Sequence, residues 1–200
     1  MKTALLLSGG VDSIAILYWL KPDVAITVDY GQLPADGEIL ASRAACDQTN
    51  TPHYVVQADC RGIGLGTMSK STPAREQVTV PYPDRPEWWP YRNQLVVTLA
   101  AAQAIPLRIG RLLIGIVKGD QCHGDGSPDF VRAMNGVLMV QEGGVSLEAP
   151  AILLDALELV RHSGVPKSLL AWAHCCHTAT VACGQCRGCL KHENILAELG

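Results

Sequence analysis

Apolar and polar positions along the chain group into short blocks that predict strands and helices in alternation. Residues 3–7 form an apolar run, and after a glycine turn the apolar spacing of a helix continues over residues 12–20. Residues 24–30 are rich in β-branched side chains, which indicates a second strand, and residues 36–49 again have helical spacing. This order of strand, turn and helix is typical of βαβ units with parallel strands.

The alternation resumes beyond a long irregular segment. Residues 54–57 predict a third strand, whereas residues 60–92 contain many prolines and no sustained periodicity. We expect this segment to be a long loop that forms the lid or wall of a site, since long loops in compact domains are commonly functional. The following blocks predict a strand at residues 111–117 and helices at residues 94–104, 128–138 and 151–162.

Together these elements predict an α/β fold, an open, mostly parallel, doubly wound sheet with helices on both faces. Ligands of such sheets bind beyond the carboxyl ends of the strands, so we expect the functional site there. Near residue 170 the apolar periodicity gives way to cysteines and glycines, and residues 187–199 then predict a last helix. We therefore expect a main domain over residues 1–170 and a small cysteine-rich tail over residues 171–200.

The composition restricts the partners and the compartment. With 200 residues, 48% of them hydrophobic, the chain has enough apolar material for one buried core. The net charge of −3 provides no general basic field for duplex nucleic acid. No stretch reaches the roughly 20 apolar residues of a membrane-spanning helix, and the apolar start is too short for a signal peptide. We expect a cytoplasmic protein that binds a small molecule and uses its cysteines for metal or catalysis rather than for disulfides.

Residues 8–13, with the sequence SGGVDS, lie between the first predicted strand and the first predicted helix. Glycines let the backbone approach a ligand and helix-terminal amides attract an anion, so this turn predicts a phosphate site. Asp12 would repel phosphate unless a cation such as Mg²⁺ bridges the two, which implies a magnesium nucleotide. The string lacks the Lys-Ser/Thr pair of a Walker loop and the third glycine of a dinucleotide fingerprint. The alternative is an ordinary turn in which Asp12 or Ser13 caps the helix.

The tail carries cysteines with the spacing of metal ligands. Cys183, Cys186 and Cys189 form two successive CxxC spacings, which let thiolates from a tight turn reach one tetrahedral ion. Cys175 or Cys176 is available as the fourth thiolate. Four thiolates predict a closed, structural Zn²⁺ site without an open position for water. The same spacing also allows a redox CxxC pair or an iron–sulfur cluster.

The SGGVDS string resembles the PP-loop of the ATP pyrophosphatase superfamily, whose signature is SGGxDS. This resemblance implies an adenine nucleotide alpha hydrolase-like PP-loop fold, with residues 1–170 as the ATP-binding and adenylating domain. It further implies an enzyme that uses ATP with Mg²⁺, transfers AMP to a carboxylate or carbonyl oxygen, and holds the released pyrophosphate on the loop. A nucleophile then displaces the AMP.

Four motifs together resemble the 7-cyano-7-deazaguanine synthase (QueC) family over nearly the whole chain. They are SGGVDS, the string DYGQ at residues 29–32, Arg92-Asn93 at a helix start, and CGxCxxC near the end. The resemblance implies a ligase of queuosine biosynthesis that converts 7-carboxy-7-deazaguanine and ammonia to the nitrile and releases AMP and pyrophosphate. It also implies a zinc held by four cysteines, and it ranks Cys176 before Cys175 because the family has an aromatic residue or a histidine, here His177, after this cysteine.

The resemblance and the side-chain chemistry assign roles to individual residues. ATP and pyrophosphate are expected on Ser8, Gly9, Gly10, Val11, Asp12, Ser13, Asp29, Gly31 and Gln32. The carboxylate-bearing deazapurine is expected at Arg92, Asn93, Asp120 and Asp125. The expected catalytic residues are Asp12, Arg92, Lys118 and Asp120, and the expected zinc ligands are Cys176, Cys183, Cys186 and Cys189. For Trp88, Trp89 and Tyr91 the expectations are stacking on a flat ring or simple packing of the loop.

The chain departs from the family pattern at several places. Leu33-Pro34 follow the DYGQ string where the family has a basic residue and a histidine, residues 119–125 are altered, and the usual Thr-Lys is missing after Ala149-Pro150. These differences keep open a reaction that joins the activated carboxylate as an amide to an amine of a protein or small molecule. They also leave room for another PP-loop activity, a noncatalytic ATP-binding subunit or a zinc-bearing binding module. We further expect a homodimer without membrane contact.

Overall fold

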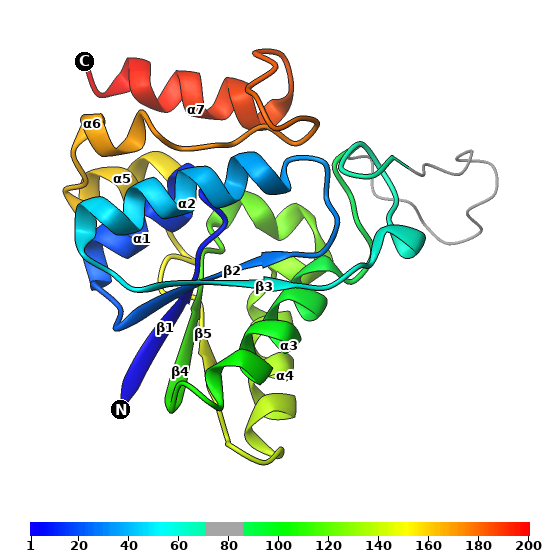
Figure 1. Ribbon diagram of the computed structural model, residues 1–200. Coiled ribbons are helices and arrows are strands. Elements are labelled where there is room, and N and C mark those ends of the chain that lie inside the picture. Colours follow the sequence, from blue (N-terminus) through cyan, green and yellow to red (C-terminus); the bar gives the residue numbers. More distant parts are fainter. Residues whose placement is uncertain (71–85) are drawn as a thin grey trace.

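Parallel strands form the central sheet of the protein (Figure 1). The structure, a computed structural model, describes residues 1–70 and 86–200. Within these residues the strands are β1 (Lys2–Leu6), β2 (Val24–Asp29), β3 (His53–Gln57), β4 (Ile109–Ile114) and β5 (Ser146–Glu148). Their order is β3-β2-β1-β4-β5, and every neighbouring pair is parallel. The carboxyl ends of the strands therefore meet at one edge of the sheet.

Helices cover both faces of this sheet (Figure 1). One face carries α3 (Arg92–Ala104) and α4 (Pro128–Met139). The other carries α1 (Val11–Leu20), α2 (Ala35–Thr49), α5 (Ala156–Ser163), α6 (Lys167–Leu170) and the C-terminal α7 (Arg187–Glu198). Short 3-10 helices, η1 (Arg61–Ile63), η3 (Lys118–Cys122) and η4 (Gly124–Gly126), lie in the connections. The predicted α/β fold is confirmed, and no helix among the described residues is long and apolar enough to cross a membrane.

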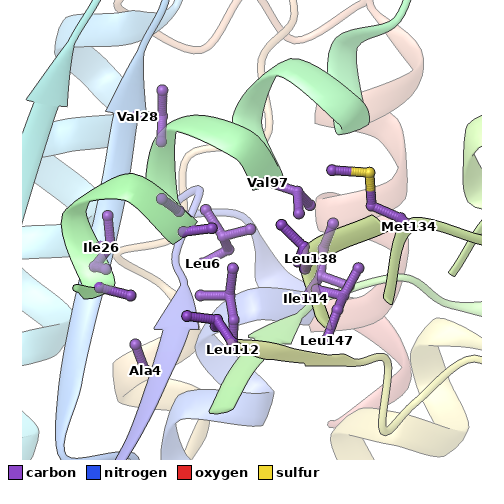
Figure 2. Packing of buried hydrophobic residues seen from close by; sticks show 14 of the residues in the cluster. Ala4, Leu6, Ile26, Val28, Val97, Leu112, Ile114, Met134, Leu138 and Leu147 are labelled. Carbon is purple, nitrogen blue, oxygen red and sulfur yellow. The ribbon is translucent and has the colours of Figure 1, made fainter. Parts of the chain in front are cut away.

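The strands bury side chains on both faces, which creates two apolar layers. In β1 and just after it, Ala4 and Leu6 pack into one layer and Leu5 and Leu7 into the other, because successive side chains of a strand point to opposite faces. Figure 2 shows how strand side chains meet α3 and α4 in the first layer: Leu6, Leu112, Ile114, Leu147, Val97, Met134 and Leu138. In the second layer α7 contributes Ile195, so the tail shares the apolar core of the sheet domain.

Strands β4 and β5 and helices α5 and α6 differ from the sequence-based prediction. Strand β4 covers Ile109–Ile114 rather than residues 111–117. Strand β5 was not predicted because it has only three residues, of which Leu147 is buried. Helix α5 begins at Ala156 rather than at residue 151, because Asp155 accepts a hydrogen bond from the Glu158 amide and Glu158 accepts one from the Asp155 amide, both at 2.8 Å. This reciprocal cap fixes the helix start, and residues 150–153 form turns. The single turn of α6 was also not predicted.

The expected long loop at residues 60–92 lies partly outside the described residues. Its described ends pack against the sheet domain: Met68 and Trp89 are 3% and 2% exposed and belong to the layer beneath α3. The indole ring of Trp89 meets the ring of Tyr30 edge-on, with 4.9 Å between the ring centroids. Tyr91, in contrast, is exposed. Packing therefore accounts for Trp89 at this position.

Candidate active site and cysteine cluster

The SGGVDS loop joins the end of β1 to the start of α1. Gly9 has a φ of +73°, and a Cβ there would lie 2.6 Å from the Glu38 carbonyl oxygen, so the position requires glycine. Gly10 is the N-cap of α1, and no side chain caps the helix; the Ser13 hydroxyl instead donates to the Gly10 carbonyl at 2.9 Å. Neither Asp12 nor Ser13 therefore caps the helix, as the alternative interpretation of this turn required. Uncapped amides at a helix N-terminus form an anion site.

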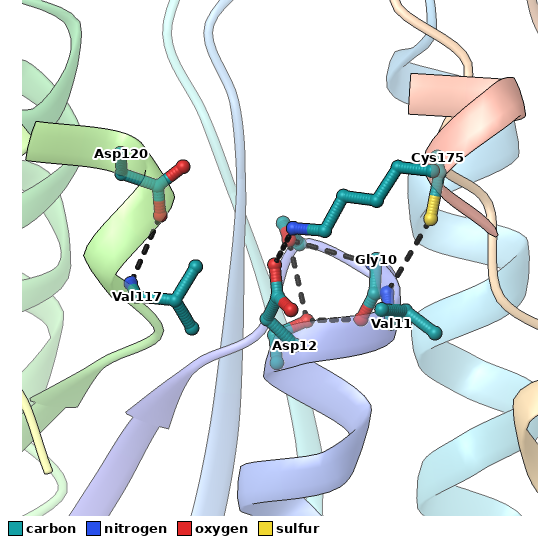
Figure 3. A network of polar contacts seen from close by, with 9 residues as sticks. Gly10, Val11, Asp12, Val117, Asp120 and Cys175 are labelled. Carbon is teal, nitrogen blue, oxygen red and sulfur yellow. Dashed lines mark hydrogen bonds and ion pairs between the residues drawn. The ribbon is translucent and has the colours of Figure 1, made fainter. Parts of the chain in front are cut away.

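A cavity of about 260 Å³ opens beside this loop, at the carboxyl ends of β1, β2 and β4. Its lining includes most of the residues predicted to bind phosphate or substrate: Ser8, Gly10, Val11, Asp12, Ser13, Arg92, Asn93 and Asp120. Gly9 accepts a hydrogen bond from the His174 amide at 2.8 Å, beneath the loop. Figure 3 shows Gly10, Val11 and Asp12 between Asp120 on one side and Cys175 on the other. Most of the predicted phosphate and substrate residues thus meet in one place.

The carboxylate of Asp12 has one paired and one unpaired oxygen atom. Its Oδ2 atom accepts a hydrogen bond from the Lys191 ammonium of α7, whereas its buried Oδ1 atom has no partner among the described residues. Burial raises the pKa of Asp12, and the Lys191 ammonium opposes this effect. Lys191 was not predicted from the sequence, because it lies 179 positions from Asp12 and no local motif links the two residues. A buried carboxylate oxygen without a partner, on a residue that lines the cavity, suits a cation such as Mg²⁺.

Asp125 and Lys118 lie outside the lining of this cavity. Asp125 accepts the Asn93 amide at 3.1 Å, and its carbonyl accepts the Asn93 side chain at 2.8 Å, so Asp125 holds the start of α3 in place. Asp120 does line the cavity, and its Oδ2 atom accepts the Val117 amide at 3.0 Å. Lys118 is exposed at the start of η3. Of these predicted residues, Asp120 is the one placed beside the cavity.

Arg92 and Glu38 lie on helices that face the cavity from opposite sides of the sheet. Arg92, the first residue of α3, is half-buried and has no carboxylate partner among the described residues. Glu38 of α2 accepts a hydrogen bond from the Gln32 amide nitrogen at 2.8 Å. Burial raises the pKa of Glu38 to about 7, although the Gln32 hydrogen bond opposes it. Glu38 was not predicted, since an acidic residue in a helix carries no functional signal by itself.

The DYGQ string forms the wall between this cavity and a second hollow. Gln32 is buried, accepts the Tyr30 amide at 2.9 Å and donates to the Val28 carbonyl at 3.2 Å. Tyr30 lines the first cavity, whereas the three residues predicted to bind nucleotide line the second hollow of about 880 Å³: Asp29, Gly31 and Gln32. Gln32 therefore reaches the first cavity indirectly, through its contact with Glu38.

Four cysteines of the tail converge on one point. The thiol sulfurs of Cys176, Cys183, Cys186 and Cys189 all lie within 4.8 Å of one another, and Cys183 and Cys189 are 3.9 Å apart. Zinc–sulfur bonds of about 2.3 Å give a tetrahedral sulfur–sulfur distance of about 3.8 Å, so this arrangement could hold a zinc ion. Backbone amides of Gln185 and Cys186 lower the pKa of Cys183 to about 6, which favours the thiolate.

Cys175 points away from this cluster and toward the loop. Its sulfur accepts the Val11 amide at 3.4 Å, which is the first amide of α1. Gly188 of α7 packs directly against the Cys175 backbone, because a Cβ there would lie 1.7 Å from the Cys175 carbonyl oxygen. The structure thus separates the two neighbouring cysteines: Cys176 belongs to the cluster, and Cys175 belongs to the wall of the cavity.

Comparison with known proteins identifies the family of this chain. The family model described as "Queuosine biosynthesis protein QueC" matches residues 2–200. The chain belongs to the QueC family. A protein of Desulforudis audaxviator named 7-cyano-7-deazaguanine synthase is 32% identical, covering 100% of this chain and 98% of its own length. Proteins with the same name from Methanosarcina barkeri and Trichormus variabilis are 28% and 32% identical, covering 100% of this chain and 95% of their own length. As a member of a family of synthases, the chain is an enzyme.

Proposed function

We propose that this enzyme is a ligase that uses ATP and ammonia to convert 7-carboxy-7-deazaguanine to 7-cyano-7-deazaguanine, releasing AMP and pyrophosphate. The main support is the cavity in which the uncapped N-terminus of α1, Asp12, Arg92 and Asp120 meet. The substrate is inferred from the relatives named 7-cyano-7-deazaguanine synthase, which match over the full chain. Neither the loop nor the relatives alone would connect phosphate binding with this acid.

The loop residues are suited to hold and release pyrophosphate. The amides of Asp12 and Ser13 at the start of α1 and the hydroxyls of Ser8 and Ser13 can donate to phosphate oxygens. Asp12 would hold Mg²⁺ through its unpartnered Oδ1 atom, and the metal would neutralise phosphate charge. Because these groups are fixed before ATP binds, they can stabilise the charge that develops on the leaving pyrophosphate.

Arg92 and Asp120 are suited to orient the acid. The guanidinium of Arg92 faces the cavity without a carboxylate partner among the described residues and can bind the substrate carboxylate with two parallel hydrogen bonds. Asp120 can accept hydrogen bonds from the amino edge of a guanine-like ring. Together they would bring the carboxylate oxygen toward the α-phosphorus of ATP on the SGGVDS loop, which is the alignment that adenylation needs.

The atom balance of this reaction requires two activations. A carboxylate carries two oxygens and a nitrile carries none, so both carbon–oxygen bonds must break. In the first round AMP leaves with one oxygen when ammonia attacks the activated carbon, and an amide results. In the second round the amide oxygen is activated and leaves with AMP, while protons are lost from nitrogen. We therefore propose that two ATP are consumed for each nitrile.

The four-cysteine cluster would hold Zn²⁺ in a structural role. Its donors are four thiolates, and a closed set of four leaves no position for substrate or water. The ion would fix the start of α7, because Cys186 is the N-cap of that helix and accepts the Cys189 amide at 3.4 Å. The metal would thus contribute to folding rather than to the reaction.

Product analysis tests the proposal directly. The enzyme is incubated with ATP, Mg²⁺, 7-carboxy-7-deazaguanine and ammonium, and the products are measured by mass spectrometry and nucleotide chromatography. We expect the nitrile with AMP and pyrophosphate, at two AMP per nitrile. An amide with one AMP, or transfer to an added protein or amine, would replace the nitrile assignment by amide ligation. ADP and orthophosphate would refute adenylation.

A further inference from the structure

Lys191 connects the cysteine-rich tail to the SGGVDS loop. It follows Cys189 by two residues on α7, and its ammonium contacts Asp12 Oδ2. The side chains of Lys191 and Asp12 are only 35% and 17% exposed, so both charges are largely withdrawn from water. Lys191 also lines the same cavity as Ser8 and Ser13. A cation supplied by the tail therefore lies beside the proposed phosphate site.

The loop cannot balance the charge of pyrophosphate with its own residues. It contributes amides, hydroxyls and the Asp12 carboxylate, but no cationic side chain. Among the described residues that line the cavity, Arg92 and Lys191 carry a permanent positive charge. Arg92 approaches from α3, where its Nη1 atom lies 3.6 Å from the Met68 sulfur. Of the two cations, Lys191 is the one that contacts the loop.

We propose that Lys191 is a phosphate-binding residue of this enzyme, delivered to the SGGVDS loop by the cysteine-rich tail. Before ATP binds, its ammonium neutralises the buried carboxylate of Asp12. When ATP binds, the flexible side chain turns its ammonium from Asp12 Oδ2 to a phosphate oxygen and stabilises the charge of the departing pyrophosphate. This inference rests on the proposed function, because it assigns one more residue to the same phosphate site.

The tail is attached closely enough to hold Lys191 at this place. The His174 amide donates to the Gly9 carbonyl at 2.8 Å, and Cys175 accepts the Val11 amide at 3.4 Å. These contacts join the segment just before the cysteine cluster to both sides of Gly10. At the other end of the cluster, α7 starts at Arg187 and carries Lys191 within its second turn. The four-cysteine cluster thereby sets the position from which the ammonium reaches the loop.

Binding of magnesium pyrophosphate measures this role without requiring turnover. We compare Lys191→Gln, Lys191→Arg and the control Lys167→Gln with the unmodified protein by titration calorimetry. Gln can still donate to Asp12 but has no charge, Arg keeps the charge, and Lys167 donates to the carbonyl of Gly200, away from the cavity. We expect Lys191→Gln to weaken binding by about tenfold or more, as loss of a hydrogen bond between two charged groups does. Lys191→Arg should stay within about threefold, and Lys167→Gln should be unchanged.

Three further measurements separate the outcomes. Metal content should be the same in all variants, and Lys191→Gln should melt at a lower temperature because the buried Asp12 carboxylate loses its cation. Raising the salt concentration should reduce the difference in pyrophosphate binding between Lys191→Gln and the unmodified protein. Equal pyrophosphate binding by Lys191→Gln and the unmodified protein would overturn the assignment, whatever the melting temperature. If Lys191→Gln binds pyrophosphate weakly but the unmodified protein forms no AMP from ATP and the deazapurine acid, the proposed function fails and the phosphate role of Lys191 stands.

Discussion

Arg187 of α7 forms an ion pair with Glu87, with 2.6 Å between Nη1 and Oε1. Glu87 is 8% exposed and lies just before the turn that leads into α3. The pair therefore connects the first residue of α7 to the segment that precedes Arg92. Since Lys191 and Arg92 line the cavity from these two helices, the pair fixes the distance between the two elements that supply its cations.

Removing this arginine should destabilise the protein. In Arg187→Ala the Glu87 carboxylate stays buried without its partner, which we expect to lower the free energy of unfolding by about 1–3 kcal/mol. Arg187→Lys should recover part of the loss. Urea unfolding measures the effect, with Arg132→Ala as the control, because Arg132 pairs with Asp129 in full solvent and should change stability by less than about 1 kcal/mol. Equal losses in both alanine variants would show that burial of Glu87 does not matter.

Local sequence patterns predicted the fold well where burial is continuous. Strands β1, β2 and β4 are buried on both faces, so they are apolar runs that the pattern detects directly. Strand β5 is only three residues long and shows a single buried Leu147, so its pairing with β4 depends on contacts that periodicity does not encode. The reciprocal cap between Asp155 and Glu158 determines where α5 begins, although the apolar spacing starts earlier.

The residues of the site also differ in whether a sequence pattern predicts them. The SGGVDS loop and the CxxCxxC run are short motifs, so their residues could be identified from spacing alone. Lys191 contacts Asp12 from 179 positions away, Glu38 contacts Gln32 from six positions away, and neither stands in a motif. Asp125, predicted to bind substrate, lies in η4 outside the cavity lining and accepts the amide of Asn93 at the start of α3. A polar residue near a site is identified by its neighbours in space, which the sequence does not supply.

Single substitutions of Cys175 and Cys176 should show which of the two binds the metal and which belongs only to the wall of the cavity. We expect Cys176→Ser to lose most of the bound metal, because a serine hydroxyl replaces one of four convergent thiolates. Cys175→Ser should retain about one zinc per chain, since its sulfur contacts the Val11 amide instead. Elemental analysis of the purified variants measures this directly, and a lower melting temperature should accompany the metal loss. Retention of zinc by Cys176→Ser together with its loss from Cys175→Ser would reverse the assignment.

Neutralising Asp12 should remove catalysis without harming the fold. In Asp12→Asn the side-chain oxygen can still accept from Lys191, and the costly burial of a carboxylate is relieved, so the melting temperature should be unchanged or higher. Release of pyrophosphate from ATP should fall by roughly 100-fold or more, because the proposed Mg²⁺ ligand is lost. Coupled pyrophosphate assays with increasing Mg²⁺ measure this. The matched control is Asp129→Asn, an exposed carboxylate on α4 that should keep full activity.

Glu38 should make the protein less stable as the pH rises. Burial raises the pKa of Glu38 from the ordinary 4.5 to about 7, so the folded protein holds this proton more tightly than the unfolded chain. The resulting stabilisation is fully present below pH 4.5 and is lost as the pH rises through about 7. In Glu38→Gln the amide still accepts from Gln32 and this dependence disappears. Between about pH 5 and pH 8 we expect the free energy of unfolding of the unmodified protein to fall by roughly 2–3 kcal/mol more than that of Glu38→Gln, as measured by urea unfolding.

As a control, Glu148→Gln removes an exposed carboxylate paired with Arg111 and should leave the pH dependence of the unmodified protein in place. Parallel pH profiles for Glu38→Gln and the unmodified protein would show that Glu38 remains ionised in the fold.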